Sequence, residues 1–257
     1  VWDVQRGNLR RQTFRGGVGT AVWGPGEDRF TGWLEEKGSI RLFTKALDSG
    51  PEQLDFLSVG ECRFPRPSEW SADGALLAFC EPQGGEEGGQ DIWLLPHGGT
   101  AEPLLATRFS EAFPAFSPDG QWLAYVSTES GRAEVYLRPL PGPGRTLQVS
   151  IGGGRAPVWS PDGREIFYQD KALDLHAVAV RGQGADLELG RPEKLFSTAD
   201  YFWGWPIRRY DVAPDGRFLF VARDPEAWRR GAEELFPDRV QVVVNWFSAL
   251  EADRSTP

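Results

Sequence analysis

The stretch PVWSPDGREIFYQD, residues 157–170, sets a Pro-Asp-Gly turn between two apolar runs. The same pattern recurs as PSEWSADGALLAFCE from Pro67, PAFSPDGQWLAYVS from Pro114 and RYDVAPDGRFLFVA from Arg209, and a degenerate copy, AVWGPGEDRFTGWL, begins at Ala21. The aromatic or apolar residue before the turn recurs at intervals of 47, 46, 43 and 53 residues, at Trp23, Trp70, Phe116, Trp159 and Val212. A period in the forties indicates a repeat protein.

One copy can be interpreted strand by strand. Pro161 presets φ for the first corner of a turn, Asp162 can hydrogen-bond nearby backbone, and Gly163 tolerates a positive φ. The apolar runs on either side then form a β-hairpin. The segments LDLHAVAV and RPEKLF that follow predict a third and a fourth strand. Each repeat is therefore a unit of four antiparallel strands.

These units predict an all-β fold, a β-propeller of five to six four-stranded antiparallel blades that is part of a larger propeller. Stacking twisted sheets radially covers both faces of each sheet; a β-sandwich or a stacked sheet array is the alternative. We expect one domain over residues 1–257, with its parts as follows: a half blade at 1–14, blades at 15–59, 60–107, 108–150 and 151–196, and a last blade at 197–257 with an insertion at 224–239.

The two ends of the chain do not form complete units. Residues 1–14 correspond to strands three and four of a blade, and the last unit offers three strands. The N-terminal strands could complete the last blade and close the ring, or they could belong to a blade that begins upstream. The chain starts with Val1 and contains no Met, so we expect a fragment or a processed product. Pro225, near the start of the insertion, favours one short helix there.

The composition excludes several classes of function. A formal net charge of −9 argues against nucleic acid as a partner, because phosphate binding needs a basic face. No apolar run approaches the roughly 20 residues that span a bilayer. The two cysteines, Cys62 and Cys80, lie in one repeat without zinc-finger spacing; they could form a disulfide in an oxidising compartment or remain buried thiols.

The repeated phrases WSADG, FSPDG, WSPDG and VAPDG, each followed by an apolar strand such as LLAF or WLAY, resemble the TolB-like, or WD-like, β-propeller repeats. Two segments resemble a narrower group, the propeller region of bacterial transmembrane Ser/Thr protein kinases. They are FSPDGQWLAYVSTESGRAEVYLRPLPGPGRTLQVS and VQVVVNWFSAL. This resemblance implies a non-catalytic sensor or docking module at the C-terminus of a larger regulator. It also implies the extracytoplasmic, periplasmic side of a membrane-anchored parent, with a cytoplasmic location as the alternative.

Other TolB-like propellers imply two further roles. One is the accessory or gating propeller of a prolyl-oligopeptidase-type or tricorn-type peptidase, and the other is a free-standing periplasmic protein. No kinase catalytic loop and no G-x-S-x-G nucleophile motif occurs in the chain, so we expect no enzyme in this segment. The segment GGVGTAVWG from Gly16 lacks the spacing of a phosphate-binding loop and falls where two blades are expected to connect, with its end, TAVWG, expected to form the first strand of the next blade.

The repeated carboxylates are expected to form turns. A calcium loop needs several oxygen ligands in one short segment, whereas these residues are spaced by whole blades. The predicted turn residues are Asp73, Gly74, Asp119, Gly120, Asp162, Gly163, Asp215 and Gly216. His97 and His176 lie in different blades and receive no catalytic role, so neither a metal nor a cofactor is expected.

Binding at the propeller face is the remaining expectation, with a protein, a peptide or a small ligand as partner and a monomeric chain. The loops that lead into strand one of each blade carry charged residues around the mouth of the central channel, namely Arg66, Glu111, Arg155 and Arg209. The aromatic segment YFWGWP adds Trp203 and Trp205, either as a platform for a ligand or as a cap on the last blade.

Overall fold

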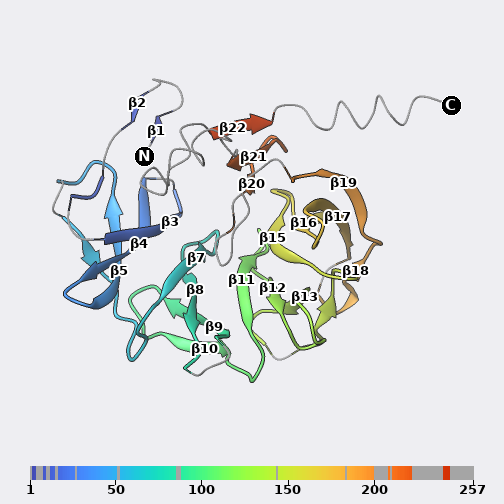
Figure 1. The fold of residues 1–257 in the computed structure, drawn as a ribbon, viewed down its shortest axis with the longest axis horizontal. Helices are drawn as coiled ribbons and strands as arrows, with labels where there is room; N and C mark the ends of the chain where they lie inside the picture. The colour runs from blue at the N-terminus through green and yellow to red at the C-terminus, as the bar shows by residue number, and fades with distance from the viewer. Residues whose placement is uncertain are drawn as a thin grey trace. The chain divides into compact units, whose positions relative to one another are not determined.

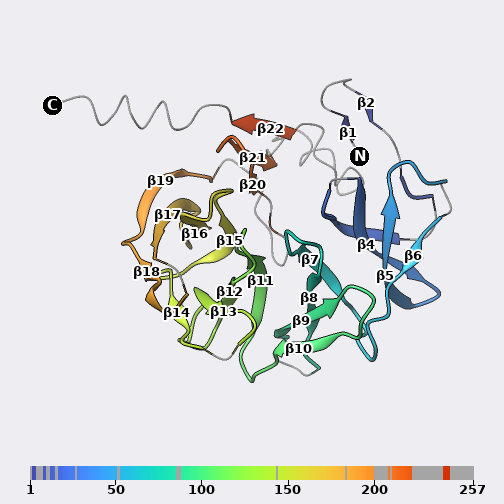
Figure 2. The ribbon, with the colours of Figure 1, turned by 180° about the vertical axis from the view of Figure 1, so that it is seen from behind.

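The computed structural model, drawn from opposite sides in Figures 1 and 2, describes most of the chain in twelve stretches. They are residues 2–3, 8–9, 12–14, 17–26, 28–50, 53–84, 88–142, 144–182, 184–199, 208, 210–221 and 240–243. The chain divides into two compact units, Val1–Phe116 and Ser117–Pro257, which are described in turn. The insertion at 224–239, with its expected helix, lies outside the described residues.

The first unit consists of antiparallel sheets in chain order (Figure 1). A two-stranded sheet pairs β1 (Trp2–Asp3) with β2 (Asn8–Leu9). The next sheet contains β3 (Gly17–Trp23), β4 (Arg29–Glu36), β5 (Ser39–Ala46) and β6 (Asp55–Phe56). The following sheet contains β7 (Arg66–Trp70), β8 (Leu76–Pro82), β9 (Gln90–Pro96) and β10 (Glu102–Leu105).

The third four-stranded sheet runs β11 (Glu111–Phe116), β12 (Trp122–Ser127), β13 (Glu134–Pro139), β14 (Leu147–Gln148), and its last three strands open the second unit. The next contains β15 (Arg155–Trp159), β16 (Glu165–Gln169), β17 (Asp174–Arg181), β18 (Glu188–Leu189) and β19 (Glu193–Ser197), with the 3-10 turn η1 (Gly184–Asp186) before β18. A three-stranded sheet joins β20 (Tyr210–Val212), β21 (Phe218–Val221) and β22 (Val240–Val243). The expected units of four antiparallel strands are confirmed, and the sheet that begins with β15 has one strand more than expected, β18.

The hairpin turn between the first two strands of a sheet is held by a repeated network of hydrogen bonds. In the sheet that begins with β7, the hydroxyl of Ser71 donates to Asp73 Oδ1 at 2.6 Å and accepts the N–H of Leu76 at 2.9 Å. Gly74 has φ 71°, a conformation that favours glycine. Ser117, Asp119 and Gly120 repeat the arrangement, as do Ser160, Asp162 and Gly163.

The turn before β21 keeps only part of this network. Ala213 replaces the serine, so the N–H of Gly216 still donates to the Ala213 carbonyl but no hydroxyl contacts Asp215. Where the serine is present, its hydroxyl hydrogen bond lowers the pKa of Asp73 and of Asp162. For Asp215 the N–H of Arg217 lowers the pKa instead. The four predicted Asp-Gly pairs therefore all lie in tight turns, with one serine missing.

Neighbouring sheets of the first unit pack through aromatic side chains. Trp70, at the end of β7, donates from its indole to the hydroxyl of Thr31 on β4 at 2.9 Å. The same tryptophan packs on a buried cluster formed by Leu42, Val59, Leu77, Phe79, Leu95 and Ala101. An aromatic residue before the turn thus joins one sheet to the preceding one.

One expectation about local structure was wrong in part. The strand expected at TAVWG is present, but it begins earlier, at Gly17, so residues 17–19 belong to β3 and not to a connection between blades. Gly19 lies against the indole of Trp33 on the paired strand β4, and a Cβ at residue 19 would overlap that ring. The glycine there makes room for a cross-strand tryptophan, and this requirement is unrelated to phosphate binding.

The two cysteines are free thiols in the structure, with Cys80 buried and Cys62 half-buried. Burial raises the pKa of Cys62 to about 12 and that of Cys80 to about 11, so both are protonated at neutral pH. Of the stretches described above, none contains a helix long and apolar enough to cross a membrane.

Candidate binding loops and an inter-sheet groove

The loop before β7 presents an exposed aromatic side chain on a fixed backbone. The carboxylate of Glu81, at the end of β8, accepts the N–H of Arg63 at 2.7 Å and the N–H of Phe64 at 3.1 Å. Glu81 is itself 9% exposed, so these hydrogen bonds are shielded from water. Phe64, in contrast, is 49% exposed. The loop therefore holds an apolar side chain in solvent without local freedom of the main chain.

The loop before β11 is built in the same way. The side-chain amide of Gln83 donates to the carbonyl of Thr107 at 2.9 Å and to that of Phe109 at 2.6 Å. The guanidinium of Arg108 lies 4.9 Å from the centre of the Phe109 ring, a cation–π arrangement. An Arg-Phe dipeptide thus precedes strand one in two successive sheets of the first unit, at Arg63-Phe64 and at Arg108-Phe109.

One strand positions both of these loops. Glu81 lies near the end of β8 and Gln83 directly follows that strand, so the same end of β8 contacts both loops. β11 also packs against β7. The two Arg-Phe dipeptides are therefore neighbours on one surface of the first unit.

The loop before β15, in the second unit, has a different clamp. Glu134 is fully buried, and its carboxylate accepts the hydroxyl of Ser150 at 2.5 Å and the N–H groups of Gly152 at 3.0 Å and Gly153 at 2.9 Å. Arg132 adds an ion pair at 2.8 Å. Ile151, within this clamped loop, is 78% exposed. This loop, like the loop before β7, therefore holds an apolar side chain in solvent.

The structure places three of the charged residues expected at the channel mouth, each as the first residue of a strand. Arg66 begins β7 and is half-buried, and Arg155 begins β15 and is exposed. Glu111 begins β11 but is 2% exposed, and it accepts the hydroxyl of Thr107 at 2.5 Å. Glu111 thus supports its loop and offers no surface charge.

Arg66 and Glu111 lie in the first unit and Arg155 in the second, while Arg209, Trp203 and Trp205 lie outside the described residues. Sequence reasoning selected these loops but missed the apolar residues that they present, namely the exposed Phe64 and Ile151 and the half-buried Phe109. The repeated Arg-Phe dipeptide was the available signal for the first two, whereas nothing in the sequence marks Ile151.

Each of the two histidines has a structural environment. His97 lies exposed in the turn after β9, with its ring 6.4 Å from that of Trp70. His176, on β17, stacks on Tyr168 and has Nε2 3.0 Å from Asp170 Oδ2. Burial raises the pKa of Asp170, but hydrogen bonds from the N–H of Asp174 and from His176 outweigh it, and the pKa is lowered.

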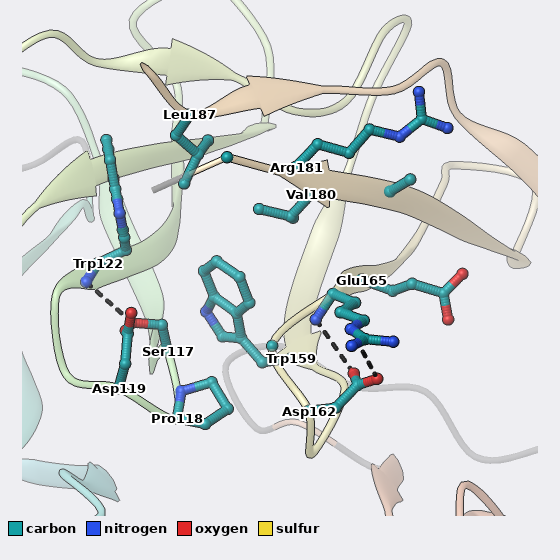
Figure 3. Close-up of a pocket in the computed structure, with 14 residues that line it drawn as sticks. Ser117, Pro118, Asp119, Trp122, Trp159, Asp162, Glu165, Val180, Arg181 and Leu187 are labelled. Carbon is teal, nitrogen blue, oxygen red and sulfur yellow. Dashed lines mark hydrogen bonds and ion pairs between the residues drawn. The ribbon is translucent and has the colours of Figure 1, made fainter. Parts of the chain in front are cut away.

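A two-lobed groove opens beside the Pro-Asp-Gly turns of the second unit. Its larger lobe, about 880 Å³, lies between the turn before β12, the turn before β16 and the end of β17. In Figure 3 Trp122 and Leu187 are at one side of this lobe and Asp162 and Glu165 at the other. A smaller lobe of about 370 Å³ shares Trp122 and Leu187. Among the described residues no cluster of histidine, cysteine and carboxylate side chains could hold a metal ion.

Comparison with known proteins identifies several similar sequences, although no protein-family model matches the chain. An uncharacterized protein of Agrobacterium fabrum is 27% identical over 158 residues, which cover 60% of this chain and 52% of that protein. Tricorn protease homolog 1 of Streptomyces coelicolor is 34% identical over 107 residues, 40% of this chain and 9% of the homolog. Tol-Pal system protein TolB of Hydrogenovibrio crunogenus is 39% identical over 56 residues, 22% of this chain and 13% of that protein. The chain thus spans about half the length of the first relative and far less of the other two.

Solved structures match over a longer range. A candidate TolB from Agrobacterium tumefaciens superposes with a TM-score of 0.60 at 22% identity, over 81% of this chain and 71% of that one. TolB from Acinetobacter baumannii gives 0.60 at 14% identity, over 82% and 50%. The periplasmic gluconolactonase of Pseudomonas aeruginosa gives 0.53 at 16% identity, over 94% and 76%. The fold is therefore a TolB-like β-propeller, which is shared by proteins with and without enzymatic names.

Proposed function

We propose that this TolB-like β-propeller chain is a protein-binding module that docks a partner through two loops of its first unit, the loops before β7 and before β11, and catalyses no reaction itself. The observation that carries the proposal is the combination of accessible aromatic residues with clamped main chain. Phe64 is exposed and Phe109 is half-buried, and each of their loops is fixed by a side-chain carboxylate or amide. Such a surface loses little conformational entropy on binding, so its apolar contacts translate into affinity.

The partner class follows from the character of these loops. Aromatic and arginine side chains are the residue types that most often dominate protein–protein binding energy, and Phe64, Phe109, Arg63 and Arg108 supply both. A small-ligand site would instead need a concave pocket at these loops. The relative named Tol-Pal system protein TolB belongs by its name to a system of several proteins, which supports the same direction.

The larger protein that contains this module can be identified from the gene. A TolB-like protein outside the cytoplasm fits the TolB relatives and the periplasmic gluconolactonase of similar fold. The 34% identity to a tricorn protease homolog favours, as a second candidate, the accessory propeller of a peptidase. The relatives described above give no support to a Ser/Thr kinase parent, which rests on the sequence resemblance alone. Sequencing the gene on both sides of residues 1–257 separates these three.

Site-specific photocrosslinking in the source bacterium tests the binding function. A benzoyl-phenylalanine replaces Phe64 in one variant and Phe109 in another. Phe56 is the matched control, because it is 42% exposed and lies in strand β6 rather than in either loop. We expect one shared protein adduct at residues 64 and 109 and none at residue 56, with the adduct identified by mass spectrometry. Equal adducts at all three residues, or none at 64 and 109, would contradict the proposal.

A further inference from the structure

The two-lobed groove arises where the second unit departs from its repeat. Strand β17 pairs with two strands along one edge: β19 pairs with its first half, from Asp174 to Ala177, and β18 with its end, at Val180 and Arg181. The chain between β17 and β18 turns at Gly182, whose φ is 78° and where a Cβ would overlap the carbonyl oxygen of Asp186. This extra ribbon carries Leu187 to the groove, where it and Trp122 separate the two lobes.

The larger lobe contains one carboxylate that the turns do not use. Asp119 and Asp162 accept hydrogen bonds from the serines of their own turns, and Arg164 pairs with Asp162. Glu165 is half-buried at the start of β16, and its carboxylate has no hydrogen bond or ion pair with any described residue. Its side chain lines the lobe, and Figure 3 shows it beside Asp162. A ligand cation at this place would gain an ionic partner in partly desolvated surroundings.

The charges around Glu165 favour a cation over an anion. Burial raises the pKa of Glu165, and the charges of Asp162 and of Glu193 on β19 raise it further. The cations near this end are Arg164, which is occupied by Asp162, and Arg181, whose guanidinium extends along the opposite edge in Figure 3. A bound lysine or arginine side chain would relieve the repulsion between Glu165 and its acidic neighbours.

The smaller lobe has a different chemistry. Pro139, Leu140 and Leu147 form its walls together with Trp122 and Leu187, and its volume of about 370 Å³ accommodates a large aliphatic or aromatic side chain. Arg145 at its edge can donate hydrogen bonds to main-chain carbonyls. One lobe suits a basic side chain and the other an apolar side chain, and the Trp122–Leu187 pair separates them. This arrangement matches alternate side chains of an extended peptide better than one compact molecule.

We propose that the groove binds an extended peptide segment of a partner protein that carries a lysine or arginine close to a large apolar residue. The basic side chain lies against Glu165 in the larger lobe, and the apolar side chain fills the smaller lobe beyond Trp122. The site lies beside the Pro-Asp-Gly turns, whereas the proposed docking face consists of the loops before β7 and β11. A negative result at one site therefore does not contradict the proposal for the other.

Titration with short peptides, followed by NMR of the tryptophan indole N–H signals, tests this inference. The probes are the capped pentapeptide Gly-Lys-Gly-Leu-Gly and two matched peptides, one with Glu in place of Lys and one with Ser in place of Leu. Trp122→Phe and Trp159→Phe variants assign the two indole signals of the groove. We expect the first peptide to shift both signals with millimolar affinity, and each matched peptide to bind at least about fivefold more weakly.

Two protein variants complete the test. Glu165→Gln keeps the shape of the side chain and removes its charge, so affinity for the lysine peptide is expected to fall about three- to tenfold. Glu129→Gln, exposed in the turn at the other end of β12, is the control and should change nothing. Equal binding of the glutamate peptide, no effect of Glu165→Gln, or no shift at about 10 mM peptide overturns the inference. Binding of free lysine as tight as that of the pentapeptide also overturns it, because the groove would then take a small cation.

Discussion

Asp162 and Glu134 are both carboxylates that accept a serine hydroxyl and main-chain N–H groups, yet they differ in surroundings and in consequence. Asp162 lies exposed in a hairpin turn that recurs in three of the sheets, and its loss affects one turn among several equivalents. Glu134 is fully buried and holds a single loop, the one that presents Ile151. The exposed, repeated carboxylate therefore determines architecture, whereas the buried, unrepeated one determines the shape of a candidate binding surface.

The largest effect is expected from Glu134→Ala. The substitution leaves the hydroxyl of Ser150 and the N–H groups of Gly152 and Gly153 without their acceptor in a buried place. We expect the free energy of unfolding to fall by about 3–5 kcal/mol in chemical denaturation. Glu188→Ala, an exposed carboxylate on β18, is the control and should stay within about 0.5 kcal/mol of the parent. A loss below about 1 kcal/mol would mean that the loop does not depend on this clamp.

A smaller effect is expected in the repeated turn. Gly120 has φ 68°, and nothing lies within 4 Å of a Cβ built there, so Gly120→Ala adds backbone strain and no clash. We expect a loss of about 1–2 kcal/mol by the same measurement, less than for Glu134→Ala. Gly74→Ala sharpens the comparison. There the Cβ would also lie 2.6 Å from Pro25, so its loss should exceed that at Gly120. The reverse order would contradict the account of the turns.

The smallest effect concerns Glu165, whose pKa is raised. A carboxyl with a raised folded-state pKa binds protons more readily in the folded state, so its contribution to stability falls as pH rises from the unfolded pKa through the folded one. Glu165→Gln removes this pH-dependent contribution to stability. We therefore expect the variant to have the higher Tm at pH 7, and the difference to vanish near pH 4 or below. A Tm difference that does not depend on pH would show that burial of the Glu165 charge has no part in it.

The sequence predicted those parts of the fold that repeat. The phrases around Asp73, Asp119 and Asp162 recur because three of the sheets use the same turn, and their spacing predicts four-stranded antiparallel sheets. Only the start of β3 was missed, because Gly17 and Gly19 resemble a connection until Trp33 is known to lie on Gly19. Repetition in the sequence is thus enough to predict the architecture, whereas the bounds of an irregular strand are set by contacts with the strand it pairs with.

The candidate site was predicted only as a location. The loops before strand one were chosen correctly as segments to inspect, but charge alone suggested Glu111, which is buried beneath its own loop. Glu81, Gln83 and Glu134 are single residues in or directly after otherwise ordinary strands, and their roles depend on contacts with loops 16–26 residues away in the sequence. Such long-range clamps have no local signature, which is why the exposed Phe64 and Ile151 became visible only in three dimensions.

The measurement that tests the central claim most directly is the affinity of the photocrosslinked partner, once purified, for two variants of the chain. Phe64→Ser removes an exposed aromatic from a clamped loop, and Phe56→Ser removes an equally exposed one from an outer strand. We expect Kd to rise about tenfold or more for Phe64→Ser and less than about twofold for Phe56→Ser, with circular dichroism unchanged in both. Equal affinities for the two variants would contradict the assignment of the loops before β7 and β11 as the docking face.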